Sequence, residues 1–352
     1  MPDQPAFDRP AFARDLVALD VGGANLKAAD GRGWTHAEPF ALWREWRDLD
    51  SRLADIVRAS GGRRVVATMT GEIADCYPSR AAGVAAIVAA VGRAAAAAGA
   101  DAGPEIYLVD GRLVPPAEAV ARPLAAAASN WHALARLAAA HAPDPRCFLV
   151  DVGSTTVDVV PLAAGRPAPS ALDDAGRMLC GELVYTGIER TPLAAIVRTL
   201  PHAGVRRPVA GERFAESRDV WLLLGGLAED AGCHDTADGG PLTRAAARVR
   251  LARAMLLEPD GFTAADALDA AAHCAAVQAR LLARGLAAAA RGCGWTPSGL
   301  VLSGHGEPLA RMAVARLGWR PTIVSLADRI GASASRCGPA HALALIARGD
   351  IR

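Results

Sequence analysis

The stretch LVALDVGGANLKAAD, residues 16–30, decides the fold of this chain. Its apolar beginning is typical of a buried strand, and Asp20 stands near the end of that strand. The strand runs into a turn that contains Gly22 and Gly23. Because glycine has no side chain, the backbone can approach a ligand closely here and offer its N–H groups to anion oxygens. The stretch therefore predicts a strand that carries a phosphate-binding turn at its end.

Lys27 is the only lysine among the 38 lysine and arginine residues, and Asn25 is one of only two asparagines. The chain is rich in residues with GC-rich codons, a coding pressure under which a lysine that can be arginine tends to become one. An ammonium group is compact enough to fit between phosphate oxygens in a tight turn, whereas a guanidinium is planar and forked. We therefore predict that Lys27 is catalytic and that Asn25 belongs to the substrate-binding site.

The same layout returns in RCFLVDVGSTTVDVVPL, residues 146–162, and a related glycine turn follows in PSGLVLSGHGEPLA, residues 297–310. Each is an apolar strand that ends in small residues. At the two D-V-G strand ends, Asp20 and Asp151 are expected to hold a hydrated Mg²⁺. The candidate substrate or phosphate contacts in the two later turns are Gly153, Ser154, Thr155, Thr156, Gly304, His305 and Gly306.

Two D-V-G turns followed by a late S-G-H-G turn resemble the phosphate loops of the actin–Hsp70–sugar-kinase superfamily. The resemblance implies an α/β fold in which two ribonuclease-H-like domains surround a cleft. We place the N-terminal domain at residues 15–145 and the C-terminal domain, with a helical insertion, at residues 146–352. Residues 1–14 are expected to form a disordered tail.

The rest of the chain alternates predicted strands and helices, which favours an α/β architecture. Strands are expected at 63–71, 183–187 and 321–330, and a hairpin is expected at 105–114. Helices are expected at 79–99, 116–142 with breaks near Pro123 and Ser129, 191–198, 214–228, 241–256, 263–290, 306–317 and 335–349.

Several segments together resemble one narrow family, labelled hydantoinase/oxoprolinase-like and tied to tetrahydromethanopterin-linked one-carbon metabolism and methanofuran biosynthesis. The resemblance covers nearly the whole chain after residue 15. True hydantoinase and oxoprolinase subunits are much longer, so their chemistry is not carried over. The segments are ATMTGEIADCYPSRAAGV (67–84), ASNWHALA (128–135), VDVGSTTVDVVPL (150–162), GELVYTGIERTPL (181–193), ESRDVWLLLGGL (216–227) and DTADG (235–239).

The family resemblance implies a transferase that condenses an aminomethyl-furanylmethyl diphosphate with the phenol oxygen of tyramine, glutamyl-tyramine or tyrosine. Lys27, the glycine turns and Mg²⁺ would neutralise the leaving diphosphate. ATP is not required, because the electrophile arrives activated. A phenol has a pKa of about 10, so a general base is useful. The candidate bases are Glu72, Asp75, Asp158 and Glu182, of which Glu72 and Asp158 are preferred.

Asn130 and Tyr185 are further candidate substrate contacts. Asn130 is the second of the two asparagines, and the ring of Tyr185 can stack on a furan or a phenol. A helix cap for Asn130 and a half-buried strand position for Tyr185 remain open as alternatives.

Composition argues against several classes of function. The formal net charge of +1 gives no electrostatic case for nucleic acid or an anionic membrane surface as a partner. The seven cysteines are odd in number and form no C-x-x-C motif, which favours reduced thiols in the cytoplasm over a disulfide framework. The alanine-rich run at 81–100 is typical of a helix rather than a membrane span. The expected partners are the small-molecule diphosphate and the phenolic amine, and a homodimer is left open.

Two other functions remain open. One is an ATP-dependent small-molecule kinase of the same superfamily, which ATP turnover with a phosphorylated product would favour. The other is a non-catalytic nucleotide-binding partner of one-carbon enzymes, which nucleotide binding without turnover would favour. The retained Lys27 and the clustered acids favour an enzyme.

Overall fold

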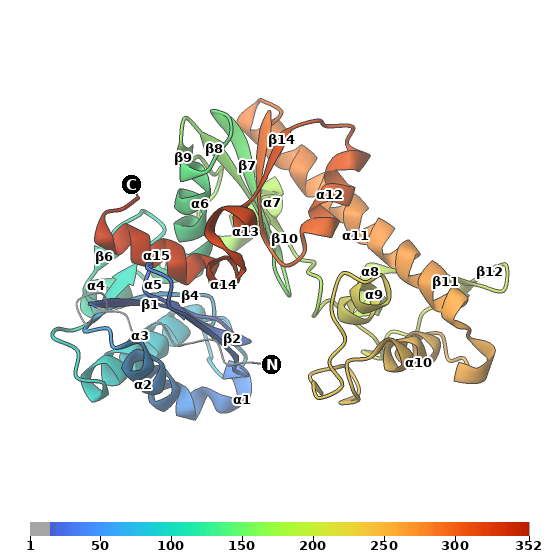
Figure 1. Ribbon diagram of the computed structural model, residues 1–352, viewed down its shortest axis with the longest axis horizontal. Coiled ribbons are helices and arrows are strands. Elements are labelled where there is room, and N and C mark those ends of the chain that lie inside the picture. The colour runs from blue at the N-terminus through green and yellow to red at the C-terminus, as the bar shows by residue number, and fades with distance from the viewer. Residues whose placement is uncertain (1–14, 352) are drawn as a thin grey trace, which may run out of the picture. The chain divides into compact units, whose positions relative to one another are not determined.

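The computed structural model describes residues 15–351, so the predicted tail at 1–14 lies outside the described residues. The chain divides into two compact units (Figure 1). Of the described residues, the first unit contains 15–141 together with 326–351, and the second is Ala142–Ser325. Each unit contains one six-stranded sheet with helices packed against it.

The first sheet has the strand order β3-β2-β1-β4-β5-β6. β1 runs antiparallel to β2 and parallel to β4, and β5 pairs with β6 as an antiparallel hairpin. The predicted strand at 63–71 and the predicted hairpin at 105–114 are therefore confirmed. The strands are β1 (Leu16–Val21), β2 (Asn25–Ala29), β3 (Thr35–Pro39), β4 (Arg64–Met69), β5 (Glu105–Tyr107) and β6 (Leu113–Val114).

Helices cover both faces of the first sheet. They are α1 (Leu42–Glu45), the 3-10 helix η2 (Trp46–Asp48), α2 (Leu49–Ser60), α3 (Arg80–Ala97), α4 (Pro116–Ala121), α5 (Pro123–Ala126), α6 (Asn130–Ala140), α13 (Leu326–Ile330), α14 (Ala332–Arg336) and α15 (Gly338–Arg348). Figure 1 shows α15 on one side of β1 and β4, and α2 and α3 on the other. Val17, Leu19 and Val21 belong to the core with α2 and α3. Because side chains alternate along a strand, Asp20 faces the α15 side.

The end of the chain differs from the predicted domain division. The sequence placed everything after residue 145 in one C-terminal domain, whereas residues 326–351 belong to the first unit. The reason is that α15 packs on β1, β2 and β4. The predicted strand at 321–330 also stops at Ser325, where α13 begins.

α3 is the helix among the described residues that is long and apolar enough, by length and composition alone, to cross a membrane. Its side chains Val84, Ile87, Val88 and Val91 are buried in the core of the first unit. This burial identifies α3 as a core helix, as its alanine-rich sequence predicted.

The second sheet has the order β10-β8-β7-β13-β14, with β9 paired to β8. β7 runs antiparallel to β8 and parallel to β13, and β13 runs parallel to β14. Strand for strand, and in the same directions, this order repeats β3-β2-β1-β4-β5. The two D-V-G turns are thus copies within one duplicated fold. The strands are β7 (Arg146–Val152), β8 (Val157–Ala163), β9 (Arg166–Pro167), β10 (Leu183–Val184), β13 (Gly299–Gly304) and β14 (Thr322–Ser325).

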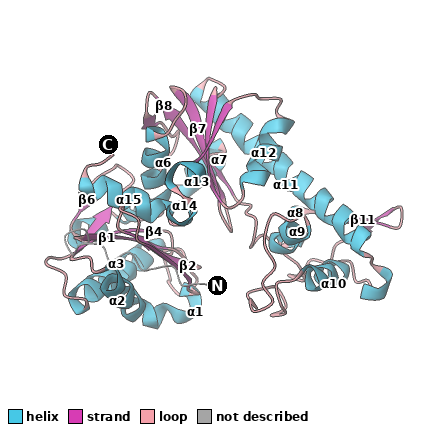
Figure 2. Cartoon of the chain, in the orientation of Figure 1, coloured by secondary structure: helices cyan, strands magenta, loops and turns pink. Residues whose placement is uncertain are grey.

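The second unit also carries a mostly helical insertion between β10 and β13 (Figure 2). Its longest helix, α11, begins at a capping box in which Thr263 and Asp266 exchange hydrogen bonds. The helices of the second unit are α7 (Asp174–Cys180), α8 (Leu193–Ile196), α9 (Ser217–Leu223), α10 (Arg244–Ala254), the 3-10 helix η3 (Pro259–Gly261), α11 (Ala264–Cys293) and α12 (Glu307–Arg316).

A hairpin of β11 (Thr199–His202) and β12 (Val205–Pro208) occupies a place where the sequence predicted no strand. The predicted helix at 191–198 is therefore only α8. Ala203 and Gly204 both have positive φ, as a two-residue hairpin turn requires. All seven cysteines are free, in agreement with the prediction that the chain has no disulfide framework.

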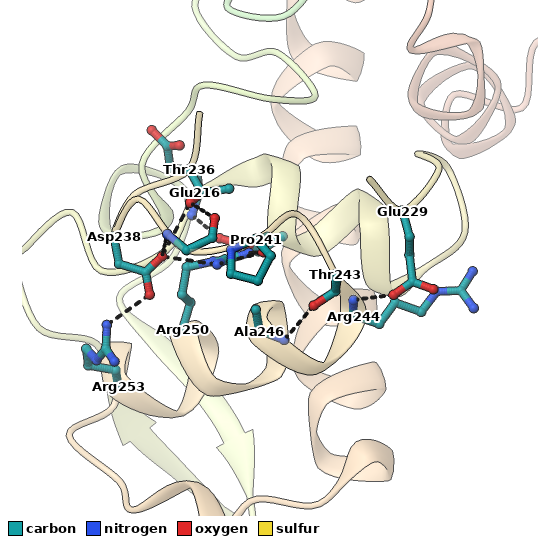
Figure 3. Close-up of polar contacts among 12 residues, drawn as sticks. Glu216, Glu229, Thr236, Asp238, Pro241, Thr243, Arg244, Ala246, Arg250 and Arg253 are labelled. Carbon is teal, nitrogen blue, oxygen red and sulfur yellow. Dashed lines mark hydrogen bonds and ion pairs between the residues drawn. The ribbon is translucent and has the colours of Figure 1, made fainter. Parts of the chain in front are cut away.

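The buried side chain of Arg250 stabilises the loop between α9 and α10 through hydrogen bonds. Arg250 is fully buried, and its Nε donates to Asp219 at 2.7 Å. Its Nη1 donates to Asp238 at 3.1 Å and to the Pro241 carbonyl at 3.4 Å (Figure 3). Arg253 reaches the other oxygen of Asp238 at 3.2 Å. These contacts hold the segment 235–241 against α10.

Candidate functional site

A polar row crosses the first sheet at the end of β1. Asp20 lies opposite Lys27 on β2 and level with Thr68 on β4. Paired residues on neighbouring strands point to the same face, so the three side chains lie in one row on the α15 side. Asp20 is 5% exposed, and the hydroxyl oxygens of Thr68 and Ser129 lie 2.7 Å apart. The row places the predicted catalytic lysine beside the predicted metal ligand.

The first turn is closed by a hydrogen bond from the Gly22 N–H to the Asn25 carbonyl at 3.1 Å. A Cβ at Gly22 would lie 2.8 Å from that oxygen, whereas a Cβ at Gly23 would meet nothing within 4 Å. Within the described residues, the N–H groups of Gly23 and Ala24 donate to no other group. Free donors with open space beside them are what an anion requires.

The two other predicted contacts have different surroundings. Asn130 begins α6, and its Oδ1 accepts a 2.7 Å hydrogen bond from the N–H of Trp131. The preceding Ala128 has a φ of 46°, a left-handed conformation that is costly for alanine. Tyr185 is 61% exposed, so the half-buried strand position left open for it is wrong. Asn130 thus has a local structural partner, whereas the ring of Tyr185 is accessible.

The second sheet has an equivalent polar row, in which an aspartate takes the position of the lysine. Asp151 on β7 lies opposite Asp158 on β8 and level with Ser303 on β13, so Asp158 has the position that Lys27 has in the first sheet. Burial raises the pKa of Asp158 to about 6; the charge of Arg177 opposes this shift and that of Asp151 adds to it. The Nη2 of Arg177 lies 2.9 Å from Asp158 Oδ1, and the side chains of the two residues are 1% and 17% exposed.

The second turn repeats the geometry of the first. The Gly153 N–H donates to the Thr156 carbonyl at 3.0 Å, and the Ser154 carbonyl accepts the N–H of Glu189 at 3.1 Å. In the part of the chain that the structure describes, the N–H groups of Ser154 and Thr155 donate to no other group. The predicted phosphate donors are therefore available in this turn as well.

The third turn packs against the second. A Cβ at Gly304 would lie 2.2 Å from the Val152 carbonyl oxygen, and the Gly306 N–H donates to that oxygen at 3.3 Å. His305 stands between the two glycines with its side chain 45% exposed, and its Nε2 lies 2.6 Å from Glu189 Oε1. The second and third turns thus contribute to one site in the second unit.

The third turn also has a counterpart in the first unit that the sequence analysis missed. The Gly71 N–H donates to the Val21 carbonyl at 3.0 Å, as Gly306 does to the end of β7. The T-G-E of residues 70–72 therefore corresponds to the H-G-E of residues 305–307. The shared G-E was a usable signal, but only the strand pairing shows that the two segments are equivalent.

Glu189 and Arg218 are site residues that the sequence analysis also missed. Glu189 Oε2 lies 2.7 Å from Arg218 Nη2, which also lies 3.0 Å from Asp235. Burial raises the pKa of Glu189, but the hydrogen bonds and charges of His305 and Arg218 outweigh burial and lower it to about 2. Glu189, Arg218 and Asp235 all lie in segments that resemble the hydantoinase/oxoprolinase-like family. That resemblance was the available signal for them.

The other candidate bases, Glu72, Asp75 and Glu182, differ in how accessible they are to a substrate. Glu72 is 1% exposed and lies 3.8 Å from Arg80. Glu182 is fully buried, and its Oε1 accepts the Ser170 N–H at 2.7 Å. Asp75 is exposed in the loop after β4. Glu72 and Glu182 are therefore buried, and the carboxylate of Asp75 is the accessible one of the three.

The donor chemistry fits the predicted Mg²⁺. Within residues 15–351, no group of three or more His, Cys, Asp or Glu side chains could hold a metal ion. Asp20 and Asp151 each supply one carboxylate from a central strand of a sheet. Mg²⁺ is commonly bound by one or two carboxylates together with substrate phosphates and water, so a full set of protein ligands is not needed.

Comparison with known proteins gives a family and a fold. A family model described as hydantoinase/oxoprolinase matches residues 63–345. A relative in Methanocaldococcus jannaschii, named (4-{4-[2-(gamma-L-glutamylamino)ethyl]phenoxymethyl}furan-2-yl)methanamine synthase, is 26% identical over 339 residues, which are 96% of this chain and 98% of that one. A protein of the same name in Methanococcus vannielii is 26% identical over 211 residues, covering 59% of this chain and 93% of the relative.

A solved structure, nucleotide-free acetone carboxylase, is similar with a TM-score of 0.51 at 14% identity and covers 91% of this chain and 51% of that one. A ROK family glucokinase from Streptomyces griseus has a TM-score of 0.45 at 15% identity, over 95% of this chain and 99% of that one. With the duplicated sheets, the first likeness confirms the predicted fold, mixed α/β with two domains of the actin/Hsp70/sugar-kinase type.

Proposed function

The chain belongs to the hydantoinase/oxoprolinase family, and we propose that it is a transferase of methanofuran-type cofactor biosynthesis. It joins an aminomethyl-furanylmethyl diphosphate to the phenol oxygen of tyramine, glutamyl-tyramine or tyrosine and releases diphosphate. The observation that carries this proposal is the similarity, over nearly the full length of both chains, to a relative whose name describes such a phenoxymethyl-furan amine.

The proposed reaction exchanges one carbon–oxygen bond for another. The bond between the furanylmethyl carbon and the diphosphate oxygen breaks, and its electron pair leaves with the diphosphate. The furan ring stabilises the positive charge that develops on the carbon. The phenol oxygen then bonds to that carbon and gives its proton to a base. The substrate arrives activated, so the reaction consumes no ATP.

In this proposal the first unit holds the leaving group. Lys27 faces the same side of the sheet as Asp20, and the Gly23 and Ala24 N–H groups are available at the adjacent turn. Positive charge and preorganised N–H donors stabilise the negative charge that grows on a leaving diphosphate. Mg²⁺ bound at Asp20 or Asp151 would neutralise further phosphate charge.

Of the two carboxylates preferred as bases, Asp158 is the more accessible. Its side chain is 17% exposed, whereas that of Glu72 is 1% exposed. Burial raises the pKa of Asp158 to about 6, against the opposing charge of Arg177. A carboxyl with such a pKa is mostly ionised at neutral pH and can accept a proton.

The test supplies purified protein with the furanylmethyl diphosphate, Mg²⁺ and each of the three phenols, without ATP, and follows the products by mass spectrometry. The proposal expects an ether product with at least one phenol. A second arm supplies ATP and small-molecule acceptors. Failure with every phenol, together with a phosphorylated acceptor in the second arm, would overturn the proposal in favour of a kinase.

A further inference from the structure

The second unit contains an imidazole–carboxylate pair, His305 and Glu189, that is separate from the candidate bases Glu72, Asp75, Asp158 and Glu182. His305 Nε2 is 2.6 Å from Glu189 Oε1, and their side chains are 45% and 24% exposed. The pair combines a reachable imidazole with a more buried carboxylate. This is the arrangement by which proteins orient a histidine that exchanges protons.

The ionisation of Glu189 determines which nitrogen of His305 is free. The pKa of Glu189 is lowered to about 2, so the carboxylate is ionised and can only accept hydrogen bonds. The hydrogen of the neutral imidazole therefore sits on Nε2, which donates to Glu189. Nδ1 keeps its lone pair, and the hydrogen bond that the His305 ring makes in the described structure is the one at Nε2.

Arg218 holds the second carboxylate oxygen of Glu189, the one that His305 does not contact. Its side chain is 7% exposed, and its Nη2 lies 2.7 Å from Glu189 Oε2. The Arg218 N–H also donates to the Glu189 carbonyl at 3.1 Å. Arg218 sits at the start of α9, where a capping box between Glu216 and Asp219 secures the helix. Both oxygens of Glu189 are thus engaged, one by the arginine and one by the histidine.

The pair stands beside the predicted substrate turns. The Glu189 N–H bonds the Ser154 carbonyl of the second turn. A Cβ at Gly306 would lie 2.2 Å from Val152 Cγ1 and 2.8 Å from Ile188 Cγ2, so the third turn is pressed onto these neighbours. His305 is the only residue of the Gly304–Gly306 turn with a side chain. The fold therefore presents one imidazole whose partner, Glu189, is bonded to the turn with the available Ser154 and Thr155 N–H groups.

We propose that His305 is the catalytic base that accepts the phenol proton, with Glu189 and Arg218 as positioning residues. The proposal rests on the proposed transferase function. The phenol proton moves to His305 Nδ1 as the phenol oxygen bonds to the furanylmethyl carbon. The electron pair of the broken carbon–oxygen bond leaves with the diphosphate, so no oxidant, reductant or further reactant is needed.

His305 suits this role better than Asp158 for two reasons. Its side chain is 45% exposed against 17% for Asp158, so a bulky phenol can reach it. Arg177 occupies Asp158 Oδ1 at 2.9 Å and stabilises the form of Asp158 without a proton, which weakens it as a base. Asp158 is then the acid that anchors Arg177 next to the second row.

The test varies the acidity of the phenol. His305→Gln is compared with wild type on tyramine and on a nitro-substituted tyramine, whose phenol is a much stronger acid and needs less help from a base. We expect kcat on tyramine to fall by about 10²-fold or more, and the loss to shrink to about tenfold or less on the acidic phenol. If the variant loses the same factor on both phenols, His305 is not the base.

Two variants check the assignment. His36→Gln removes a second imidazole–carboxylate pair, that of His36 with Glu38 at 3.0 Å. Ala37 is the strand partner of Lys27, so the side chain of the neighbouring His36 points to the opposite face of the sheet from Lys27. We expect this control to keep wild-type activity. Asp158→Asn is measured on the same two phenols. If the loss of kcat shrinks on the acidic phenol in the Asp158 variant and not in the His305 variant, Asp158 is the base.

Glu189→Gln tests positioning. We expect kcat on tyramine to fall by about tenfold or more with KM little changed, and the loss to shrink on the acidic phenol. In the His305→Gln background, the same change should have almost no further effect. A merely structural role would lower activity equally on both phenols. If wild type makes no ether at all, the proposed transferase function is wrong. If wild type is active but the variants lose the same factor on both phenols, the transferase function stands and the assignment of His305 and Glu189 is wrong.

Discussion

Lys27 and Asp158 hold the same position in the two halves of the chain. Each lies on the second strand of its sheet, directly opposite the aspartate that precedes the glycine turn: Asp20 for Lys27, and Asp151 for Asp158. The duplicated fold therefore pairs opposite charges in one row and like charges in the other. Like charges placed directly opposite are destabilising in a sheet, so the second row depends on its buried Arg177.

Replacement of Lys27 by arginine should not preserve activity. A guanidinium keeps the charge but cannot take the compact position of an ammonium between phosphate oxygens. We expect Lys27→Arg and Lys27→Met both to lower kcat/KM by about 10²-fold or more. Steady-state kinetics measure this, and an arginine variant with near-wild-type kcat/KM would show that only charge is needed at this position.

Gly23→Ala should separate ligand binding from folding. A Cβ at Gly23 would meet nothing within 4 Å, so the melting temperature should stay within about 2 °C of wild type. The added methyl group would crowd a bound diphosphate, and the affinity for inorganic diphosphate, measured by calorimetry, should fall by about tenfold. Gly211→Ala, which is equally open, is the matched control. Unchanged diphosphate affinity would exclude a role of this turn.

The raised pKa of Asp158 predicts a dependence of stability on pH. The folded value is about 6 and the ordinary value 3.8. Because folding favours the protonated form of Asp158, this carboxyl adds to the free energy of unfolding at low pH. The contribution is complete below about pH 4 and is lost as the pH rises through 6. The difference amounts to about 3 kcal/mol at most. Urea unfolding between pH 4 and 7 should show this loss in wild type relative to Asp158→Asn, and parallel curves for the two proteins would contradict it.

Arg250 should be essential to the stability of the second unit. It is fully buried between Asp219 and Asp238, so Arg250→Met leaves the buried carboxylate of Asp219 without its arginine and should cost about 3–5 kcal/mol. Arg253 contacts the same Asp238 but is 45% exposed, and Arg253→Met should cost less than about 1 kcal/mol. Equal losses in urea unfolding would mean that burial does not decide the effect.

The turns were predictable because their signals are local. An apolar run that ends in D-V-G fixes a strand and its turn within a few residues, and both copies formed where the sequence placed them. The internal repeat followed from the same motif. The sequence could not show that α15 packs on the first sheet, because nothing in the amphipathic pattern of α15 selects one sheet over another.

The contacts within the site were harder to predict. His305 and Glu189 are 116 residues apart, and only the packing of the third turn on the second brings them together. The burial of Glu72 could not be predicted either, since a carboxylate in a loop is usually exposed. Residue type and spacing predict which side chains carry chemistry, but the three-dimensional fold decides which of them a substrate can reach.

The most direct test of the central claim follows the oxygen atoms. The furanylmethyl diphosphate is prepared with ¹⁸O in the bridge between carbon and phosphorus and is given to the protein with Mg²⁺ and the phenol, without ATP. Mass spectrometry of both products should find the label in the released diphosphate and none in the ether, because the carbon–oxygen bond breaks and the phenol supplies the new oxygen. Label retained on a furanylmethanol, with the phenol unchanged, would mean that the protein cleaves the phosphorus–oxygen bond and is not this transferase.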